Sequence, residues 1–149
     1  MRTCLLIVHI AAGNAGLILG PVALALPHRV PWRPRVIVAY RAGVMLVCFA
    51  AFGLVALKPE VWGLGLIALG TLAAVSGGAV VGRRRRPGWQ SRYASLMGGS
   101  YISLVTAFLV VNVGGPVAWV LPSVVGSPLV ARAARRAGKG DVESAGARR

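Results

Sequence analysis

The stretch Thr3–Leu26, TCLLIVHIAAGNAGLILGPVALAL, contains no charged residue. A single helix needs about 20 consecutive apolar residues to cross a bilayer, so this stretch is long enough to do so. Two polar side chains, His9 and Asn14, interrupt its apolar character. The stretch therefore predicts a membrane-spanning helix over residues 3–26, and the remainder of the chain repeats the pattern.

The composition favours an integral membrane protein. The chain has 149 residues, of which 56% are hydrophobic and 13% charged, whereas a soluble domain carries about 25% charged residues. The net charge of +14 raises the question of nucleic acid binding, but the basic residues flank apolar stretches, as topogenic signals do. We expect anionic lipid headgroups as partners rather than nucleic acid. The arginine-rich, lysine-poor composition suggests a bacterial protein of the cytoplasmic (inner) membrane.

Four further apolar stretches follow the first. The expected membrane spans are about residues 3–26, 36–57, 61–81, 93–113 and 117–131. The last span is short and contains Pro122, which predicts a kink. The fold class expected is therefore all-α, an integral membrane helical bundle of five transmembrane helices covering residues 1–131. The basic segment 132–149 is expected to be a disordered cytoplasmic tail.

The basic residues predict an orientation. The first and third connections and the tail hold nearly all of them, whereas the second and fourth connections hold only Lys58. By the positive-inside rule, the N-terminus lies outside and the C-terminus inside, provided that the fifth segment also crosses. The residues expected to contact lipid headgroups are His28, Arg29, Arg33, Arg35, Arg83, Arg84, Arg85 and Arg86.

Polar side chains within the spans are the candidate functional residues, because polar groups at membrane depth usually face the bundle interior or a cavity. These candidates are His9, Asn14, Ser100, Tyr101 and Thr106. His9 and Asn14 point about 140° apart on an ideal helix, so a single group would not bind both. The favoured interpretation is hydrogen bonds from His9 and Asn14 to serine, threonine or tyrosine side chains on the fourth span. Such bonds contribute about 0.6 kcal/mol on average.

Small residues in the first span predict close helix packing. Gly16 and Gly20 form a GxxxG pattern, and Gly13 extends it. This pattern lets two helix backbones approach closely, either within one subunit or between subunits.

Catalytic and cofactor chemistry finds little support in the residue set. The three acidic residues, Glu60, Asp141 and Glu143, all lie outside the spans, so no carboxylate pair is available within the membrane, and we expect no enzyme and no metal site. Haem b coordinated by two histidines of one chain is excluded, because His9 and His28 are about 30 Å apart along a helix. A haem held by two copies of His9, or by a methionine partner such as Met45 or Met97, stays open.

Several motifs together resemble a known group of proteins. The motifs are His9-x-x-x-Gly13, Gly20-Pro21-x-Ala23-Leu24, His28-Arg29, Met97-Gly-Gly-Ser100-Tyr101-Ile102, Asn112, Leu121-Pro122 and Gly126-x-Pro128. The chain resembles small uncharacterised bacterial multi-pass membrane proteins that carry a domain of unknown function. It departs from them in lacking a histidine shortly before Met97 and a Gly-Arg after His28. The resemblance implies a multi-pass membrane protein with no established activity.

The sequence thus favours a non-enzymatic accessory or structural component of a membrane assembly, either a homo-oligomer or a subunit of a larger complex. Two alternatives stay open. One is a small redox protein that binds haem or quinone through His9, and the other is a small-solute permease whose path the polar candidates line.

Overall fold

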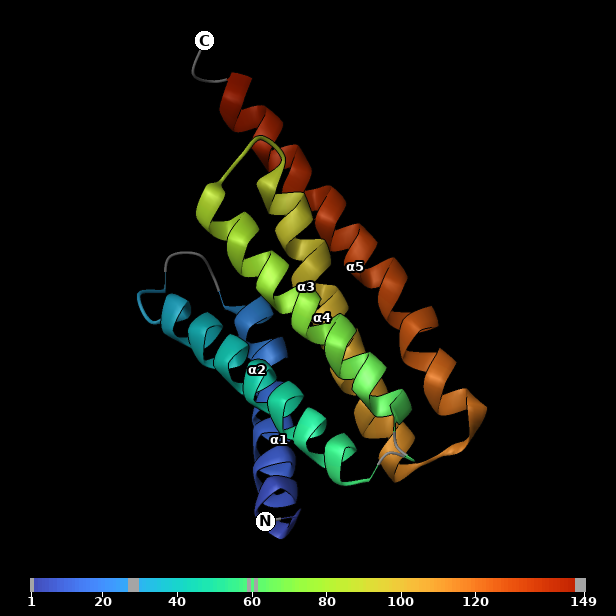
Figure 1. The fold of residues 1–149 in the computed structure, drawn as a ribbon. Helices are drawn as coiled ribbons and strands as arrows, with labels where there is room; N and C mark the ends of the chain where they lie inside the picture. The colour runs from blue at the N-terminus through green and yellow to red at the C-terminus, as the bar shows by residue number, and fades with distance from the viewer. Residues whose placement is uncertain (1, 27–29, 59, 61, 147–149) are drawn as a thin grey trace. The chain divides into compact units, whose positions relative to one another are not determined.

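Five long helices make up the part of the chain that the computed structural model describes, residues 2–26, 30–58, 60 and 62–146 (Figure 1). These residues contain no strand. The helices are α1 (Arg2–Ala25), α2 (Arg33–Leu57), α3 (Trp62–Arg84), α4 (Trp89–Asn112) and α5 (Gly115–Gly146). Each is long and apolar enough to cross a membrane. The prediction of an all-helical chain with five helices of bilayer length is therefore confirmed.

The helices begin and end where the backbone requires it. Pro34 lies in the first turn of α2, where its missing N–H costs no helical hydrogen bond. Gly88 precedes α4 with φ of 71°. Between α4 and α5, Gly114 and Gly115 have φ values of 70° and 75°, which glycine adopts without the steric cost of a Cβ atom. The Gly-Gly pair therefore permits the turn from α4 into α5.

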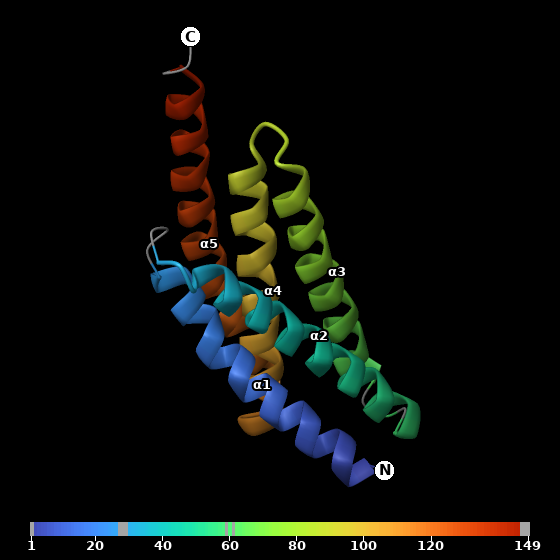
Figure 2. The same ribbon diagram turned by 90° about the vertical axis from the view of Figure 1, so that its left-hand side faces the viewer.

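The chain divides into two compact units, Met1–Leu72 and Ala73–Arg149. In the first unit, α1 and α2 pack side by side and antiparallel (Figures 1 and 2). Leu5 Cδ1 lies 3.2 Å from the position that a Cβ atom on Gly53 would occupy, and Val47 Cγ2 lies 3.8 Å from that position on Gly13. Early residues of α1 therefore meet late residues of α2. The buried side chains of α2 are Tyr40, Val44, Val47, Cys48, Ala50 and Ala51.

In the second unit, α4 and α5 are antiparallel neighbours that interlock at two glycines. Val130 of α5 packs on Gly98 of α4, and Ile102 of α4 packs on Gly126 of α5. The two glycines thus form reciprocal gaps, each filled by a β-branched side chain of the other helix. The last part of α3 contacts α4 in a similar manner, since Gly78 lies against Met97.

The end of α5 differs from the prediction. We expected a short span over 117–131 followed by a disordered tail, whereas the helix continues to Gly146 and the segment long and apolar enough to cross a membrane is Gly115–Gly138. The segment 131–137, ARAARRA, consists of alanine and arginine, both of which are strong helix formers. Helix propensity explains why 131–137 is helical despite its charge, but not the helix over 138–146, which contains three glycines. The last three residues of the predicted tail, 147–149, lie outside the described residues.

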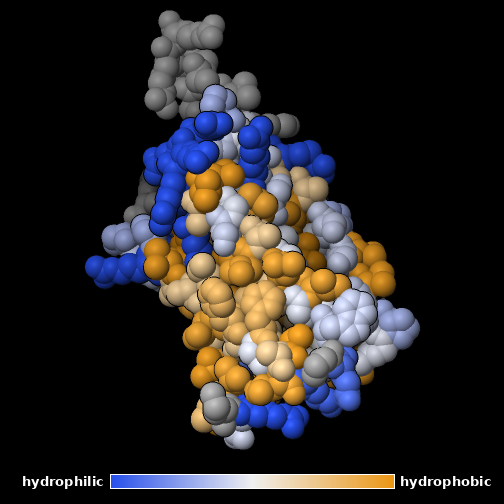
Figure 3. All heavy atoms as spheres, viewed as in Figure 1, coloured by the Kyte–Doolittle hydropathy of each residue, from blue (hydrophilic) through white to orange (hydrophobic). Residues whose placement is uncertain are grey.

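Large apolar side chains are exposed on all five helices, as expected of helices that face lipid. Examples are Ile7, Ile18, Val38, Leu66, Val111 and Leu129. On the face shown in Figure 3, hydrophilic side chains gather over the turn between α3 and α4, hydrophobic side chains cover the middle, and hydrophilic side chains appear again at the lower edge. The surface of the second unit is therefore polar at the end where the arginines lie.

Candidate functional site

His9 connects α1 to α2 through a hydrogen bond. Its ring is half-buried, and Nδ1 lies 3.2 Å from the carbonyl oxygen of Val47. Because a carbonyl oxygen only accepts, Nδ1 carries the proton and donates it, and the neutral ring then has Nε2 as its unprotonated nitrogen. We expected a hydroxyl side chain of the fourth helix as the partner, whereas the structure shows the main-chain carbonyl of Val47 in α2. The antiparallel pairing of α1 and α2 places Val47 opposite His9, and the main-chain carbonyl oxygen of Val47 accepts the hydrogen bond.

Asn14 lies at the centre of α1 and its side chain is exposed. Five residues separate it from His9, and the two side chains occupy different faces of the helix, as the helical spacing predicts. Among the residues that the structure describes, the Asn14 amide makes no hydrogen bond. The predicted bond from Asn14 to a hydroxyl of the fourth helix joins the first unit to the second, so it stays a prediction. α1 thus presents a polar amide on an otherwise apolar face at the middle of a membrane-length helix.

Two of the polar candidates of α4, Ser100 and Thr106, bond back to their own helix. Ser100 and Thr106 are buried. Ser100 Oγ donates to the carbonyl oxygen of Met97 at 2.8 Å, and Thr106 Oγ1 donates to that of Ile102 at 2.9 Å. Tyr101 is half-buried. These residues belong to the second unit, whereas His9 and Asn14 of α1 belong to the first.

The small residues of α1 lie on its packed side. Ala12, Gly16 and Gly20 are buried and follow one another at intervals of four residues. Gly13 is half-buried. The carbonyl oxygen of Ala12 lies 3.7 Å from the position that a Cβ atom on Gly43 of α2 would occupy. The glycines therefore occupy the side of α1 opposite to Asn14, and close approach of the two backbones accompanies them.

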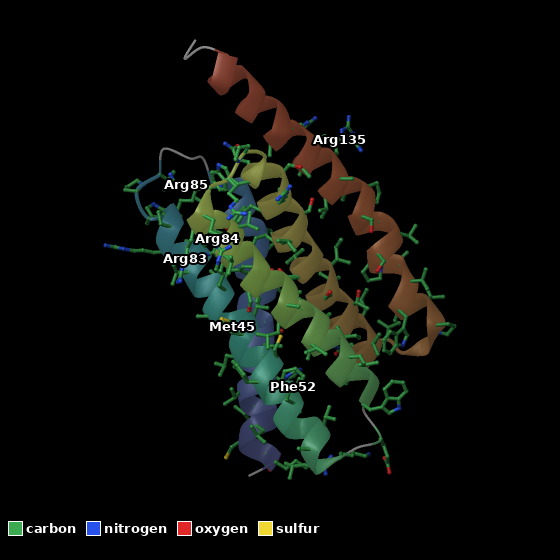
Figure 4. The ribbon with its side chains drawn as sticks, turned by 45° about the horizontal axis from the view of Figure 1, so that its top comes forward. Met45, Phe52, Arg83, Arg84, Arg85 and Arg135 are labelled. Atoms are coloured by element: carbon green, nitrogen blue, oxygen red, sulfur yellow. The ribbon has the colours of Figure 1, made fainter. Side chains whose placement is uncertain are left out.

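The arginine run forms the turn between α3 and α4. Arg83, Arg84, Arg85 and Arg86 are all exposed, and Figure 4 labels the first three where α3 ends. The guanidinium carbon of Arg85 lies 5.6 Å from the ring centroid of Trp89, an arrangement typical of a cation–π contact. Of the other predicted headgroup residues, Arg33 is half-buried and Arg35 exposed, and His28 and Arg29 lie outside the described residues.

A pocket of about 160 Å³ opens beside this turn. Its lining residues are Val80, Val81, Arg84, Arg86, Pro87, Trp89 and Arg92. Three arginines and no acidic side chain line it, so it is a positively charged pocket with an apolar wall. Sequence reasoning did not select Trp89 and Arg92. Their spacing of three residues on a helix directly after the arginine run is the signal that places them on one face.

Metal-ligating side chains do not gather within the described residues, where no group of three His, Cys, Asp or Glu side chains is close enough to hold an ion. Cys4 is exposed, Cys48 is buried, and both are free thiols. The site features are thus one interhelical histidine, one exposed amide at the middle of α1 without a hydrogen bond among the described residues, and one basic pocket.

Five apolar helices that expose apolar side chains define the class, a helical protein of the multi-pass membrane type. Comparison of the chain with family models, with curated proteins and with solved structures finds no match.

Proposed function

We propose that this chain is a non-enzymatic accessory or structural component of a bacterial inner-membrane assembly, and that α1 makes the contact with its partner. We also propose that the chain is related to the small multi-pass membrane proteins that its sequence motifs resemble. One observation carries the proposed role: the exposed amide of Asn14 at the centre of α1.

An amide facing hydrocarbon is unfavourable, because no water is present there to replace the lost hydrogen bonds. α2 covers the opposite side of α1 and leaves Asn14 exposed. A partner helix that accepts and donates hydrogen bonds at this depth removes the cost. An asparagine amide offers both a donor and an acceptor, so a second copy of α1 related by a two-fold axis satisfies it. A homo-oligomer is therefore the assembly to test first.

Replacing Asn14 by leucine is expected to abolish self-association. Two differently tagged copies, co-expressed and solubilised in mild detergent, should co-purify as wild type and not as Asn14→Leu variants. Asn112→Leu is the matched control, because Asn112 is also exposed but its Nδ2 donates to the carbonyl oxygen of Phe108 in its own helix, at 2.7 Å. Co-purification that survives Asn14→Leu, or its absence in the wild type, contradicts assembly through this amide.

The orientation that we propose is N-terminus outside and C-terminus inside, with α5 crossing the membrane and bending at Pro122. The distribution of basic residues supports it, since the two crossings by α4 and α5 return the chain to the side of the arginine turn and so place the basic end of α5 on that side. Pro122 removes one helical N–H from α5, which supports a bend at that position.

A redox site at His9 is the second candidate, because the hydrogen bond to Val47 engages Nδ1 and leaves Nε2 for a ligand. This is the way in which metal-bound histidines are usually held. Our leading proposal nevertheless expects no haem. The purified protein should show no Soret band, oxidised or reduced with dithionite. A Soret band in the wild type that is lost in His9→Ala would instead favour the redox function.

The permease alternative has less support. Ser100 and Thr106 direct their hydroxyl protons to carbonyl oxygens of α4, so these donors are engaged within the helix rather than offered to a solute. Both residues are also buried, which does not favour contact with a passing solute.

A further inference from the structure

We propose that the pocket at the α3–α4 turn binds the phosphate group of an anionic membrane lipid. In this proposal Arg84, Arg86 and Arg92 surround the phosphate, and Val80 and Val81 contact the less polar part of the same lipid. The proposal requires that the chain is embedded in a membrane. It does not depend on the accessory role or on assembly through Asn14.

The charge of the pocket favours a phosphate. Three guanidinium groups line it, and no carboxylate does. Arginine presents several N–H donors in a planar arrangement that matches phosphate oxygens, and such charge-assisted bonds are stronger than neutral ones. Without an internal carboxylate partner, the mutual repulsion of these cations is relieved when an anion enters.

The start of α4 adds a second attraction. The helix begins at Trp89, beside the pocket, and Gly88 supplies no side-chain cap to its first turn. The first N–H groups of a helix have no intrahelical acceptor, and they carry a partial positive charge. A phosphate at this point meets both the arginines and the helix terminus, a combination that recurs in anion sites.

The apolar wall distinguishes a lipid from free phosphate. Val80 and Val81 belong to the apolar part of α3, one turn before the arginines. Trp89 lies where the apolar and the charged parts of the pocket meet. It contacts Arg85 and also Tyr93, whose ring centroid lies 6.2 Å from that of Trp89. Tryptophan prefers this interfacial depth. A lipid occupies the charged and apolar parts together, whereas inorganic phosphate uses only the charged part.

Other arginines at the same end of the second unit provide a control. Gly138 of α5 lies 3.6 Å from Ser91 of α4, measured from its Cβ position, so the exposed Arg132 and Arg135 of α5 lie toward this end as well. They add to the positive field but do not line the pocket. A diffuse attraction to anionic lipid would depend equally on the arginines of the pocket and on those of α5. Binding in a defined pocket depends on the arginines that line the pocket.

The test uses Trp89 as the reporter in the full chain reconstituted into nanodiscs. Trp32, Trp62 and Trp119 are all exposed and are replaced by phenylalanine. Phosphatidylglycerol brominated near the glycerol end of its chains is then titrated into phosphatidylcholine, and quenching of Trp89 is followed. Brominated phosphatidylcholine at equal content measures non-selective contact. We expect the anionic lipid to quench at much lower content than the zwitterionic one.

Arg84→Gln with Arg92→Gln should weaken the apparent affinity for phosphatidylglycerol about 100-fold, since each hydrogen bond to a charged group contributes about a factor of ten. Arg132→Gln with Arg135→Gln removes the same charge and should change the affinity much less. Equal losses in both double variants would show a diffuse field and overturn the pocket. Displacement of the lipid by millimolar inorganic phosphate would overturn the lipid as its ligand and assign the site to free phosphate.

Discussion

Replacing Gly98 by alanine is expected to destabilise the second unit by about 1–3 kcal/mol, the usual cost of overpacking. A Cβ atom on Gly98 would lie 2.7 Å from Cγ1 and 3.1 Å from Cβ of Val130. Val130 is β-branched and stiff about χ1, and its own Cβ is already close, so rotation of the side chain does not relieve the contact. The helices α4 and α5 must separate to admit the methyl group.

The neighbouring glycine provides the control. A Cβ atom on Gly99 would meet nothing within 4 Å, and alanine is the better helix former, so Gly99→Ala should leave the free energy of unfolding unchanged or raise it slightly. Unfolding of the detergent-solubilised protein by increasing mole fractions of dodecyl sulfate measures both. A Gly98→Ala variant as stable as the Gly99→Ala variant would show that Gly98 and Val130 are not in contact.

A double variant isolates the contact further. Gly98→Ala combined with Val130→Ala removes the colliding methyl groups, so its loss of stability should be smaller than the sum of the two single losses. The reciprocal gap is more tolerant, because the atoms nearest to the Cβ position on Gly126 are Cδ1 and Cγ1 of Ile102, at 2.8 and 2.6 Å. The Cβ atom of Ile102 lies 3.7 Å from this position, farther than the 3.1 Å of Val130, so rotation of the Ile102 side chain can relieve the contact and Gly126→Ala should cost less than Gly98→Ala.

The interlocking of α4 and α5 also shows what a single sequence conceals. Gly98 and Gly99 are adjacent and chemically identical. Only the orientation of α4 toward α5 places Val130 against Gly98 and leaves space beside Gly99. The five apolar helices, by contrast, could be predicted, because the absence of charge over bilayer length is a property of each segment alone. Hydropathy determines that a helix crosses, whereas packing determines which of its faces is covered.

The candidate site was predictable to a similar extent. His9 and Asn14 stood out because polar groups are rare at membrane depth, but the acceptor for His9 is a main-chain carbonyl, which every residue possesses and no pattern marks. The pocket residues Trp89 and Arg92 were missed because the arginine run was interpreted as a topogenic signal and as separate headgroup contacts, without the residues of α4 that lie beside it. The helical end of α5 was missed because charge was taken as a sign of disorder.

Labelling of single cysteines is expected to give an all-or-none result for the orientation. In a background with Cys4→Ser and Cys48→Ala, a membrane-impermeant maleimide added to intact bacterial spheroplasts should label a Glu60→Cys variant and not a Pro87→Cys variant. Both positions are exposed in the structure, so after permeabilisation both should react. The reverse pattern, or labelling of both positions before permeabilisation, contradicts an outside N-terminus.

The arginine turn should cause this orientation rather than merely accompany it. Lysine and arginine near the ends of spans retain a connection on the cytoplasmic side, and their distribution sets the orientation of the whole chain. Changing Arg83, Arg84, Arg85 and Arg86 to glutamine leaves Arg92 as the only basic residue between the third and fourth spans. Under these conditions the Pro87→Cys position should become labelled in part of the molecules, because the charge difference across the membrane falls. The same four substitutions made as Arg→Lys keep the charge and should keep Pro87→Cys protected. If the glutamine variant also stays protected, the first connection and the end of α5 alone determine the orientation.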